Sequence, residues 1–243
     1  FKKRVEDLAL LDEDNMRKIQ ALMIYFFKNK PMPRIESIQK YVVRCSVNDI
    51  GEVFKHVSRC SYNPNISKIN MQRCNFSGQQ VFYCSMYSDT DLASTSMTCL
   101  VETAWEHIED KDLVRSYFTL SRWGVKRPLH LWVLPFSEDS ISKNRDFQRI
   151  SERMENEIRS RFSNPEDMLE PLRYMSEVFC QRVNKKNFYK LSSAFYNSLL
   201  FFNKIKDLGI DGLIYPSSNT EGAGLNVVLS KNLIDESVIE CEC

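Results

Sequence analysis

The chain contains 243 residues, of which 43% are hydrophobic and 27% charged, a composition that suits a folded protein with a substantial core. Because 33 basic residues are balanced by 32 acidic ones, the formal net charge is +1 and offers no overall field to attract nucleic acid or an anionic membrane. Direct nucleic-acid binding and a membrane-bound state are therefore not expected.

The cysteine and histidine content gives no metal-binding pattern. Eight cysteines are scattered without a Cys-x-x-Cys pair, and three histidines do not complete a zinc site. A chain of this length does not need disulfides, so we predict buried, reduced thiols and no metal. With no apolar run long enough to span a membrane and no visible secretory signal, a cytoplasmic location is expected. Phe1 is not an initiator, which leaves open whether residues are missing upstream.

The N-terminal part of the chain has helical periodicity. Residues 1–30 carry apolar side chains at spacings of three to five, which predicts one or two helices with a break around Asp12–Asn15. A further helix is expected over Ile35–Val42, and residues 43–70 are predicted to be irregular. The sequence thus predicts a helical extension, residues 1–70, that packs on its own domain rather than on a membrane or a partner.

The middle of the chain contains two isolated polar residues of interest. Arg73 precedes a turn at Gly78 and a β-prone run over Val81–Cys84. A helix expected over Met97–Trp105 then carries Glu102 among apolar neighbours. An arginine near a turn is usually solvated and a single glutamate usually pairs with a lysine, so neither residue alone indicates a site.

Two features precede the C-terminal part. The run Pro128–Pro135 is predicted to be a strand bounded by prolines. Residues 137–190 are rich in charged side chains with helical apolar spacing, and they are predicted to form a solvated helical insertion without an active group. A longer helix is expected over Ser192–Lys206, delivering the chain to Asp211.

A strand, a polar loop and a second strand are expected between Asp211 and Leu229. Pro216 has no N–H to donate, so strand pairing should stop there and the hydroxyls of Ser217 and Ser218 should project from the strand end. The glycines at 222 and 224 are expected to let the backbone approach a ligand, with free N–H groups that suit an anion such as phosphate. Considered alone, this loop is better explained as a surface hairpin with solvated hydroxyls.

Taken together, an Arg before a Gly turn and a Tyr strand, a Glu on the next helix, and a strand-end Pro-Ser followed by an Asn resemble the RES domain. This small family is named for its Arg, Glu and Ser, and its members act on NAD and often serve as the toxin of a bacterial toxin–antitoxin pair. The resemblance covers roughly residues 70 to 230, and the matching positions are Arg73, Tyr83, Glu102 and Ser217, with Asn226 in support. Glu106 is an alternative to Glu102, and Ser218 is an alternative to Ser217.

The resemblance implies an α+β fold similar to that of ADP-ribosyltransferase toxins: a split, mostly antiparallel β core with surrounding helices and NAD in the cleft. Residues 71–243 would form this NAD-binding domain. The residue types suit NAD, because a guanidinium such as that of Arg73 can clamp a pyrophosphate and a ring such as that of Tyr83 can wall a planar substrate. The Glu102 carboxylate would stabilise positive charge on the ribose, and Ser217 would bind ribose or phosphate.

The acceptor of the ADP-ribose group decides the class of enzyme. Water would make the chain an NAD glycohydrolase, inorganic phosphate an NAD phosphorylase, and a protein side chain an ADP-ribosyltransferase; on the resemblance we favour NAD degradation. An antitoxin is a possible protein partner. The alternative is a non-catalytic interaction protein on the same fold, and convergence of Arg73, Glu102 and Ser217 in one concave pocket distinguishes the two.

Overall fold

The computed structural model describes residues 2–9, 16–30, 32–86, 92–108, 116–181 and 189–242. The strands are β1 (Arg34–Ser37), β2 (Tyr41–Asn48), β3 (Val81–Met86), β4 (Tyr117–Val125), β5 (Leu129–Val133), β6 (Gly212–Pro216), β7 (Leu225–Ser230) and β8 (Ile239–Cys241). The helices are α1 (Lys2–Ala9), α2 (Met16–Phe27), α3 (Leu92–Ile108), α4 (Glu138–Lys143), α5 (Arg145–Arg161), α6 (Glu166–Cys180), α7 (Tyr189–Lys206) and α8 (Asn232–Asp235), with short 3-10 helices at Val57–Arg59 and Ile66–Lys68.

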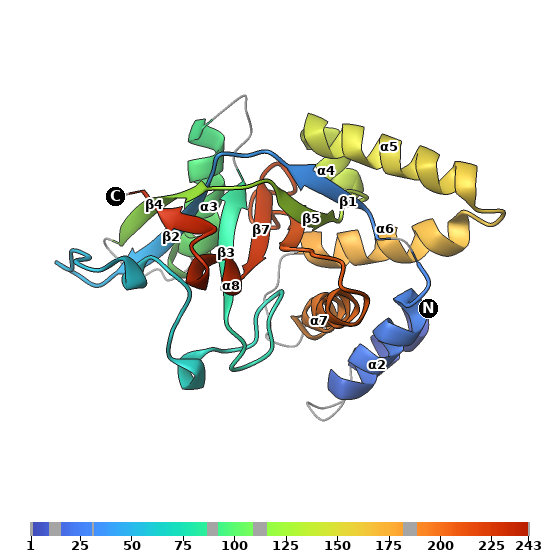
Figure 1. Ribbon diagram of the computed structural model, residues 1–243, viewed down its shortest axis with the longest axis horizontal. Helices are drawn as coiled ribbons and strands as arrows, with labels where there is room; N and C mark the ends of the chain where they lie inside the picture. The colour runs from blue at the N-terminus through green and yellow to red at the C-terminus, as the bar shows by residue number, and fades with distance from the viewer. Residues whose placement is uncertain are drawn as a thin grey trace.

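The fold is α+β, with one eight-stranded mixed sheet in the order β1-β5-β6-β7-β3-β2-β4-β8 and helices around it (Figure 1). β5 and β6 are parallel, whereas the other pairs are antiparallel. Parallel neighbours need a long crossover connection, and helices α4 to α7 supply it. The described part of the charged stretch at 137–190 is mainly helical as expected, in α4, α5, α6 and the start of α7, and it is part of the connection that this parallel pair requires.

The sheet buries apolar side chains on both faces. On the face covered by α2, α6 and α7, the rings of Phe179, Phe195 and Tyr215 pack edge to face, with centroids 5.1 Å apart for Phe179 and Tyr215. On the other face the rings of Phe82 and Trp123 lie 4.9 Å apart, and Trp123 also borders a separate surface cavity of about 310 Å³. In Figure 1, α2, α5, α6 and α7 lie on the β1 side of the sheet, and α3 lies close to β2 and β3.

The strongest elements of the sequence are confirmed. Strands occur at β3, β5, β6 and β7, and helices at α2, α3 and α7, where the apolar patterns predicted them. Pairing between β6 and β7 ends at Pro216 and Leu225, as expected from a residue without an N–H. The break expected at residues 12–15 lies outside the described residues. No helix in the described part of the chain is long and apolar enough to cross a membrane.

The helix expected over Ile35–Val42 is wrong, because these residues contribute to β1 and β2. β1 pairs with β5, and β2 pairs with both β3 and β4 and buries Val42 and Val43. Pairing with strands distant in sequence overrides a local helical pattern. The irregular stretch predicted from residue 43 is also wrong up to Asn48. Both strands belong to the same sheet as β3, so residue 70 does not separate a helical extension from the sheet.

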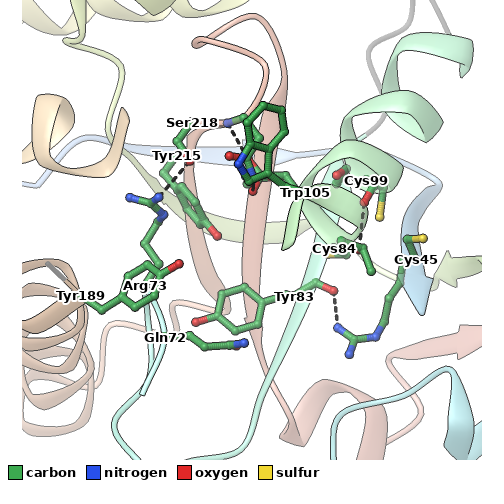
Figure 2. Close-up of a pocket in the computed structure, with 16 residues that line it drawn as sticks. Cys45, Gln72, Arg73, Tyr83, Cys84, Cys99, Trp105, Tyr189, Tyr215 and Ser218 are labelled. Carbon is green, nitrogen blue, oxygen red and sulfur yellow. Dashed lines mark hydrogen bonds between the residues drawn. The ribbon is translucent and has the colours of Figure 1, made fainter. Parts of the chain in front are cut away.

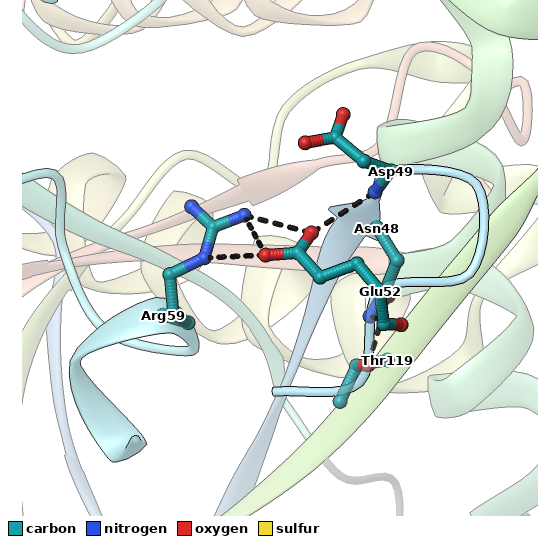
Figure 3. Close-up of polar contacts among 5 residues, drawn as sticks. All are labelled: Asn48, Asp49, Glu52, Arg59 and Thr119. Atoms are coloured by element: carbon teal, nitrogen blue, oxygen red, sulfur yellow. Dashed lines mark hydrogen bonds and ion pairs between the residues drawn. The ribbon is translucent and has the colours of Figure 1, made fainter. Parts of the chain in front are cut away.

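Polar side chains fix the loop that follows β2 (Figure 3). The Glu52 carboxylate accepts a hydrogen bond from the Asp49 N–H at 3.0 Å and a bidentate pair from Arg59, whose Nη2 lies 2.9 and 3.0 Å from its two oxygens. Thr119 of β4 donates to the side-chain oxygen of Asn48 at 2.8 Å. The Asp49 N–H, and then Arg59, lower the pKa of Glu52 below its usual value.

Candidate functional site

A cavity of about 320 Å³ opens between α3, the strands β2 and β3, the start of α7 and the loop after β6. In Figure 2, Arg73 and Tyr189 lie on one side of it and Cys45 and Cys99 on the other, with Tyr83 between them. Its volume is at the lower end of the range of about 300 to 1,000 Å³ that small-molecule sites occupy. Lining residues come from segments far apart in the sequence, so only the folded chain forms this cavity.

Glu102 lines the cavity from the middle of α3, and its carboxylate is held by three side chains. Ser217 Oγ donates to Oε1 at 2.5 Å and Asn226 Nδ2 donates to Oε1 at 2.8 Å. Asn219 Nδ2 donates to Oε2 at 2.9 Å, and the Asn219 N–H lies 3.4 Å from Oε1. A carboxylate accepts up to about four hydrogen bonds. The bonds to Oε1 therefore hold the carboxylate in place, whereas Oε2, which accepts one bond, can accept another from a ligand in the cavity.

Arg73 lies in the turn before β3 and is buried, with 8% of its surface exposed. Its Nη2 donates to Ser218 Oγ at 2.9 Å and to the Gln181 carbonyl at 3.1 Å, and its Nη1 donates to the Val178 carbonyl at 3.3 Å. Within the described residues no carboxylate lies within ion-pair distance of this guanidinium. A buried positive charge held only by neutral groups favours an anion nearby.

The two adjacent serines have different positions. Ser217 is fully buried, donates to Glu102 and accepts the Thr220 N–H, and it does not line the cavity. Ser218 lines the cavity and accepts the bond from Arg73. The sequence resemblance assigned substrate binding to Ser217. The geometry instead places Ser217 behind Glu102 and leaves the hydroxyl of Ser218 at the cavity surface.

Tyr83 of β3 lines the cavity, as expected of an aromatic wall, with Trp105 and Tyr189 as further rings. The Tyr83 hydroxyl donates to the Asn75 side-chain oxygen at 2.9 Å and accepts the Cys74 N–H at 2.8 Å. Burial raises the pKa of this phenol well above its usual value. Tyr83 is therefore a fixed, neutral ring that also orders the turn carrying Arg73. Glu106 follows on α3, and its side chain lies outside the described residues.

Arg44 of β2 is a site residue that the sequence reasoning missed. It lines the cavity, its Nη1 donates to the Tyr83 carbonyl at 2.6 Å, and its guanidinium lies over the Phe82 ring at 5.1 Å. Its Nε is buried without a hydrogen-bond partner among the described residues. Burial lowers the pKa of Arg44. The signal in the sequence was an arginine inside a β-branched run, which was missed because residues 43–70 were predicted to be irregular.

The loop between β6 and β7 does not offer free N–H groups to an anion, contrary to the expectation. The Gly222 N–H donates to the Ser217 carbonyl at 2.7 Å and the Gly224 N–H donates to Thr220 Oγ1 at 2.9 Å. The glycines allow close contact with protein instead of a ligand. A Cβ on Gly222 would lie 2.6 Å from Ser140 Oγ, and one on Gly224 would lie 2.3 Å from Thr98 Oγ1. The loop is thereby held against α3 and α4.

Burial makes the cysteine thiols at the cavity poorly suited to act as nucleophiles. Cys45, Cys84 and Cys99 line it and are free thiols, as are the other cysteines in the described part of the chain. Burial raises the pKa of all three, that of Cys99 to about 12, so the thiols are neutral near pH 7. No group of three or more potential metal ligands occurs among the residues that the structure describes.

The sequence-based site is therefore brought together in space. Arg73, Tyr83, Glu102, Ser218 and Asn226 line one cavity, and Ser217 supports Glu102 from behind. The convergence separates this arrangement from one in which the polar residues are scattered over the surface. Searches against protein-family models, curated proteins and solved structures find no match to this chain.

Proposed function

We propose that this chain is an NAD-consuming enzyme of the RES type that cleaves the bond between nicotinamide and ribose, on an ADP-ribosyltransferase-like fold. One observation carries the proposal. A carboxylate, immobilised by Ser217, Asn219 and Asn226, shares a cavity with two arginines that have no carboxylate partner among the described residues. This combination suits a substrate with a negative pyrophosphate and a sugar carbon that becomes positive during reaction.

The arginines would bind the pyrophosphate. Arg73 uses three of the five N–H donors of a guanidinium on neutral acceptors, and Arg44 has a buried Nε without an acceptor. Phosphate oxygens would accept these remaining donors and neutralise both charges. The rings of Tyr83, Trp105 and Tyr189 provide walls for the nicotinamide.

Glu102 would act on the ribose. As the bond from C1′ to the nicotinamide nitrogen breaks, its electron pair leaves with nicotinamide, which becomes neutral, and positive charge develops on C1′ and the ring oxygen. Oε2 of Glu102, with one hydrogen bond and room for another contact, would stabilise that charge. Water or inorganic phosphate would then form the new bond at C1′. Fixing the carboxylate beforehand avoids the cost of reorienting it during the reaction.

The proposal is tested by nicotinamide release from NAD, measured by chromatography with and without inorganic phosphate. We expect release by the unaltered chain and a loss of about 100-fold or more in Glu102→Gln and Arg73→Gln. Glu170→Gln, which changes an exposed carboxylate of α6, is the matched control and keeps full activity. Dependence on phosphate would identify a phosphorylase, and release without it a glycohydrolase.

The opposite results are equally informative. NAD left intact by the folded, unaltered chain would contradict NAD degradation, and transfer of ADP-ribose to added protein would identify an ADP-ribosyltransferase instead. Full activity in Glu102→Gln would remove this carboxylate from the reaction. An antitoxin remains a proposed partner, and co-purification with a protein that blocks nicotinamide release is its test.

A further inference from the structure

A second cavity, of about 490 Å³, lies away from the candidate active site, among α2, β1, β5, α5 and α7. These elements lie together on the β1 side of the molecule in Figure 1. Its walls are apolar side chains of the core, among them Phe27, Trp132, Ile158 and Leu199. Its basic side chains are those of Lys30, Arg34, Arg153, Arg161 and Lys206. We call this cavity the basic groove.

The positive charge of the basic groove is concentrated and only partly neutralised. Of the described residues that line it, Glu157 alone carries a carboxylate, and it pairs with Arg161 at 3.0 Å. Arg34 and Arg153 are exposed and form no ion pair with any residue that the structure describes. Because the whole chain has a formal net charge of only +1, this cluster is a local feature and not the result of a basic protein.

Two lysines at the basic groove are held in place by backbone oxygens. Lys30 Nζ donates to the Asp167 carbonyl at 2.7 Å and lies 4.3 Å from the centre of the Phe26 ring. Lys206 Nζ donates to the Lys28 carbonyl at 2.8 Å. Burial is the larger influence on Lys30 and lowers its pKa, while Asp167 partly opposes that effect. An anion bound here would favour the charged form of Lys30.

We propose that the basic groove binds a small amphipathic anion, with its apolar chain against the core side chains and its carboxylate or phosphate head on Arg34 and Arg153. A volume of about 490 Å³ falls within the range of about 300 to 1,000 Å³ of small-molecule sites. A free phosphate would leave the apolar walls in water, and an uncharged chain would leave Arg34 and Arg153 without an ion pair. Both parts of the groove are used only by a ligand with both properties.

The test is calorimetric titration of the full chain with four probes: decanoate, decyl phosphate, decanol and inorganic phosphate, below the concentrations at which the first two form micelles. We expect saturable binding of one decanoate or decyl phosphate per chain. Decanol and phosphate should bind at least about tenfold more weakly, because each lacks one of the two contributions. The ratio of the decanoate and decyl phosphate affinities identifies the preferred head group.

Variants locate the site. Arg153→Gln and Arg34→Gln should each weaken binding of the preferred probe by about tenfold, because a charged hydrogen bond is lost. Arg149→Gln, one turn earlier on α5, is exposed and outside the groove, and should leave affinity unchanged. Thermal unfolding of each variant confirms that it is folded. Equal affinities in all three variants, or inorganic phosphate binding as tightly as decyl phosphate, would overturn the proposal.

Discussion

The Glu102 carboxylate is positioned by side chains from a part of the chain that lies more than a hundred positions later. Ser217 and Asn219 come from the loop after β6, and Asn226 comes from β7. Three neutral donors hold the carboxylate without neutralising its charge, which is what stabilisation of a positive transition state requires. Under the proposed function these donors would be positioning residues, and their removal should affect the reaction step more than substrate binding.

Asn226→Ala and Asn219→Ala should therefore lower kcat for nicotinamide release by about tenfold while KM changes little, because each removes one bond that orients Glu102. Steady-state kinetics with NAD measures both constants. Asn203→Ala alters an amide that binds the backbone of Ile210 away from the cavity and is a control for general loss of an asparagine. A rise in KM with unchanged kcat would show that the two amides bind substrate directly.

Arg44 gives a prediction in which replacing one residue weakens substrate binding without lowering stability. Arg44 is half-buried and its Nε is buried without an acceptor among the described residues, so the free protein bears a desolvation cost that bound phosphate would relieve. Arg44→Met should raise KM for NAD by about tenfold or more and leave the thermal midpoint unchanged or higher. Kinetics and thermal unfolding of the same preparation test this. A lower midpoint with normal KM would make Arg44 a structural residue.

At the scale of the elements, the loop between β6 and β7 depends on Gly224 for its contact with α3 and on Gly222 for its contact with α4. Gly209, which lies before β6 and outside this loop, provides a comparison. Gly222 has φ of +85° and lies against Ser140, whereas Gly209 has φ of +62° with open space around it. Alanine at either position is strained by the positive φ, at a cost of about 1 kcal/mol. Only at Gly222 does the added methyl also meet a neighbouring segment.

Gly222→Ala should consequently lower the free energy of unfolding by about 1–3 kcal/mol more than Gly209→Ala, and it should reduce nicotinamide release because Ser217 moves with the loop. Urea unfolding of both variants, with the activity assay alongside, gives the comparison. Equal destabilisation and full activity in Gly222→Ala would mean that the loop is not held by its contact with α4.

The loop after β2 should respond to pH through Glu52. Its pKa is lowered in the folded protein, so its contribution to stability is present above the unfolded pKa of about 4.3 and is lost as pH falls through the lower folded value. Glu52→Gln lacks this contribution. The thermal midpoints of the two proteins should differ near neutral pH and converge as the pH falls below the lowered folded pKa of Glu52. A difference that is independent of pH would contradict the prediction.

The elements that sequence reasoning recovered are those with a strong local signal. β6 and β7 are apolar runs on either side of Pro216, and α7 has a long helical stripe, so their assignment needs no distant partner. β1 and β2 were missed because their burial depends on β5, β3 and β4, which are remote in sequence. The same error concealed Arg44, since its place at the cavity follows from the position of β2 in the sheet.

The sequence named several residues that line the candidate site, but it did not show the hydrogen bonds among them. Glu102, Arg73 and Tyr83 were named from the sequence and lie at one cavity. The sequence left Ser217 and Ser218 as alternatives, because only the folded structure decides which hydroxyl turns toward Glu102 on α3 and which toward Arg73. Asn219 was also missed, since an asparagine in a turn is ordinary until its partner is known.

For the whole molecule, Asp211 connects the starts of the two parallel strands, β5 and β6. Its carboxylate accepts bonds from Arg127 at 2.7 and 2.8 Å and from the His130 N–H at 2.9 Å, which joins the residue before β6 to the turn before β5 and to β5 itself. The side chain of Asp211 is 8% exposed and that of Arg127 44% exposed. Most of the stability that Asp211 contributes is thus expected from its buried bond to the His130 N–H rather than from its ion pair with the more exposed Arg127.

Asp211→Ala should lower the free energy of unfolding by about 1–3 kcal/mol, because the His130 N–H loses its acceptor while Arg127 can still turn toward solvent. Asp139→Ala, which changes an exposed carboxylate on α4, should cost less than about 0.5 kcal/mol. Urea unfolding curves provide both values. Similar values for the two variants would show that the parallel pair is stable without this contact.

Each of the three cavities described above is lined by one of the three tryptophans: Trp105 lines the candidate active site, Trp123 the cavity beside β8, and Trp132 the basic groove. The molecule consequently carries a separate intrinsic fluorophore at each cavity. Variants that keep one tryptophan and replace the other two with phenylalanine would give three emission signals without an added dye. The variant that keeps Trp105 would then report binding of NAD, and the variant that keeps Trp132 would report binding of an amphipathic anion.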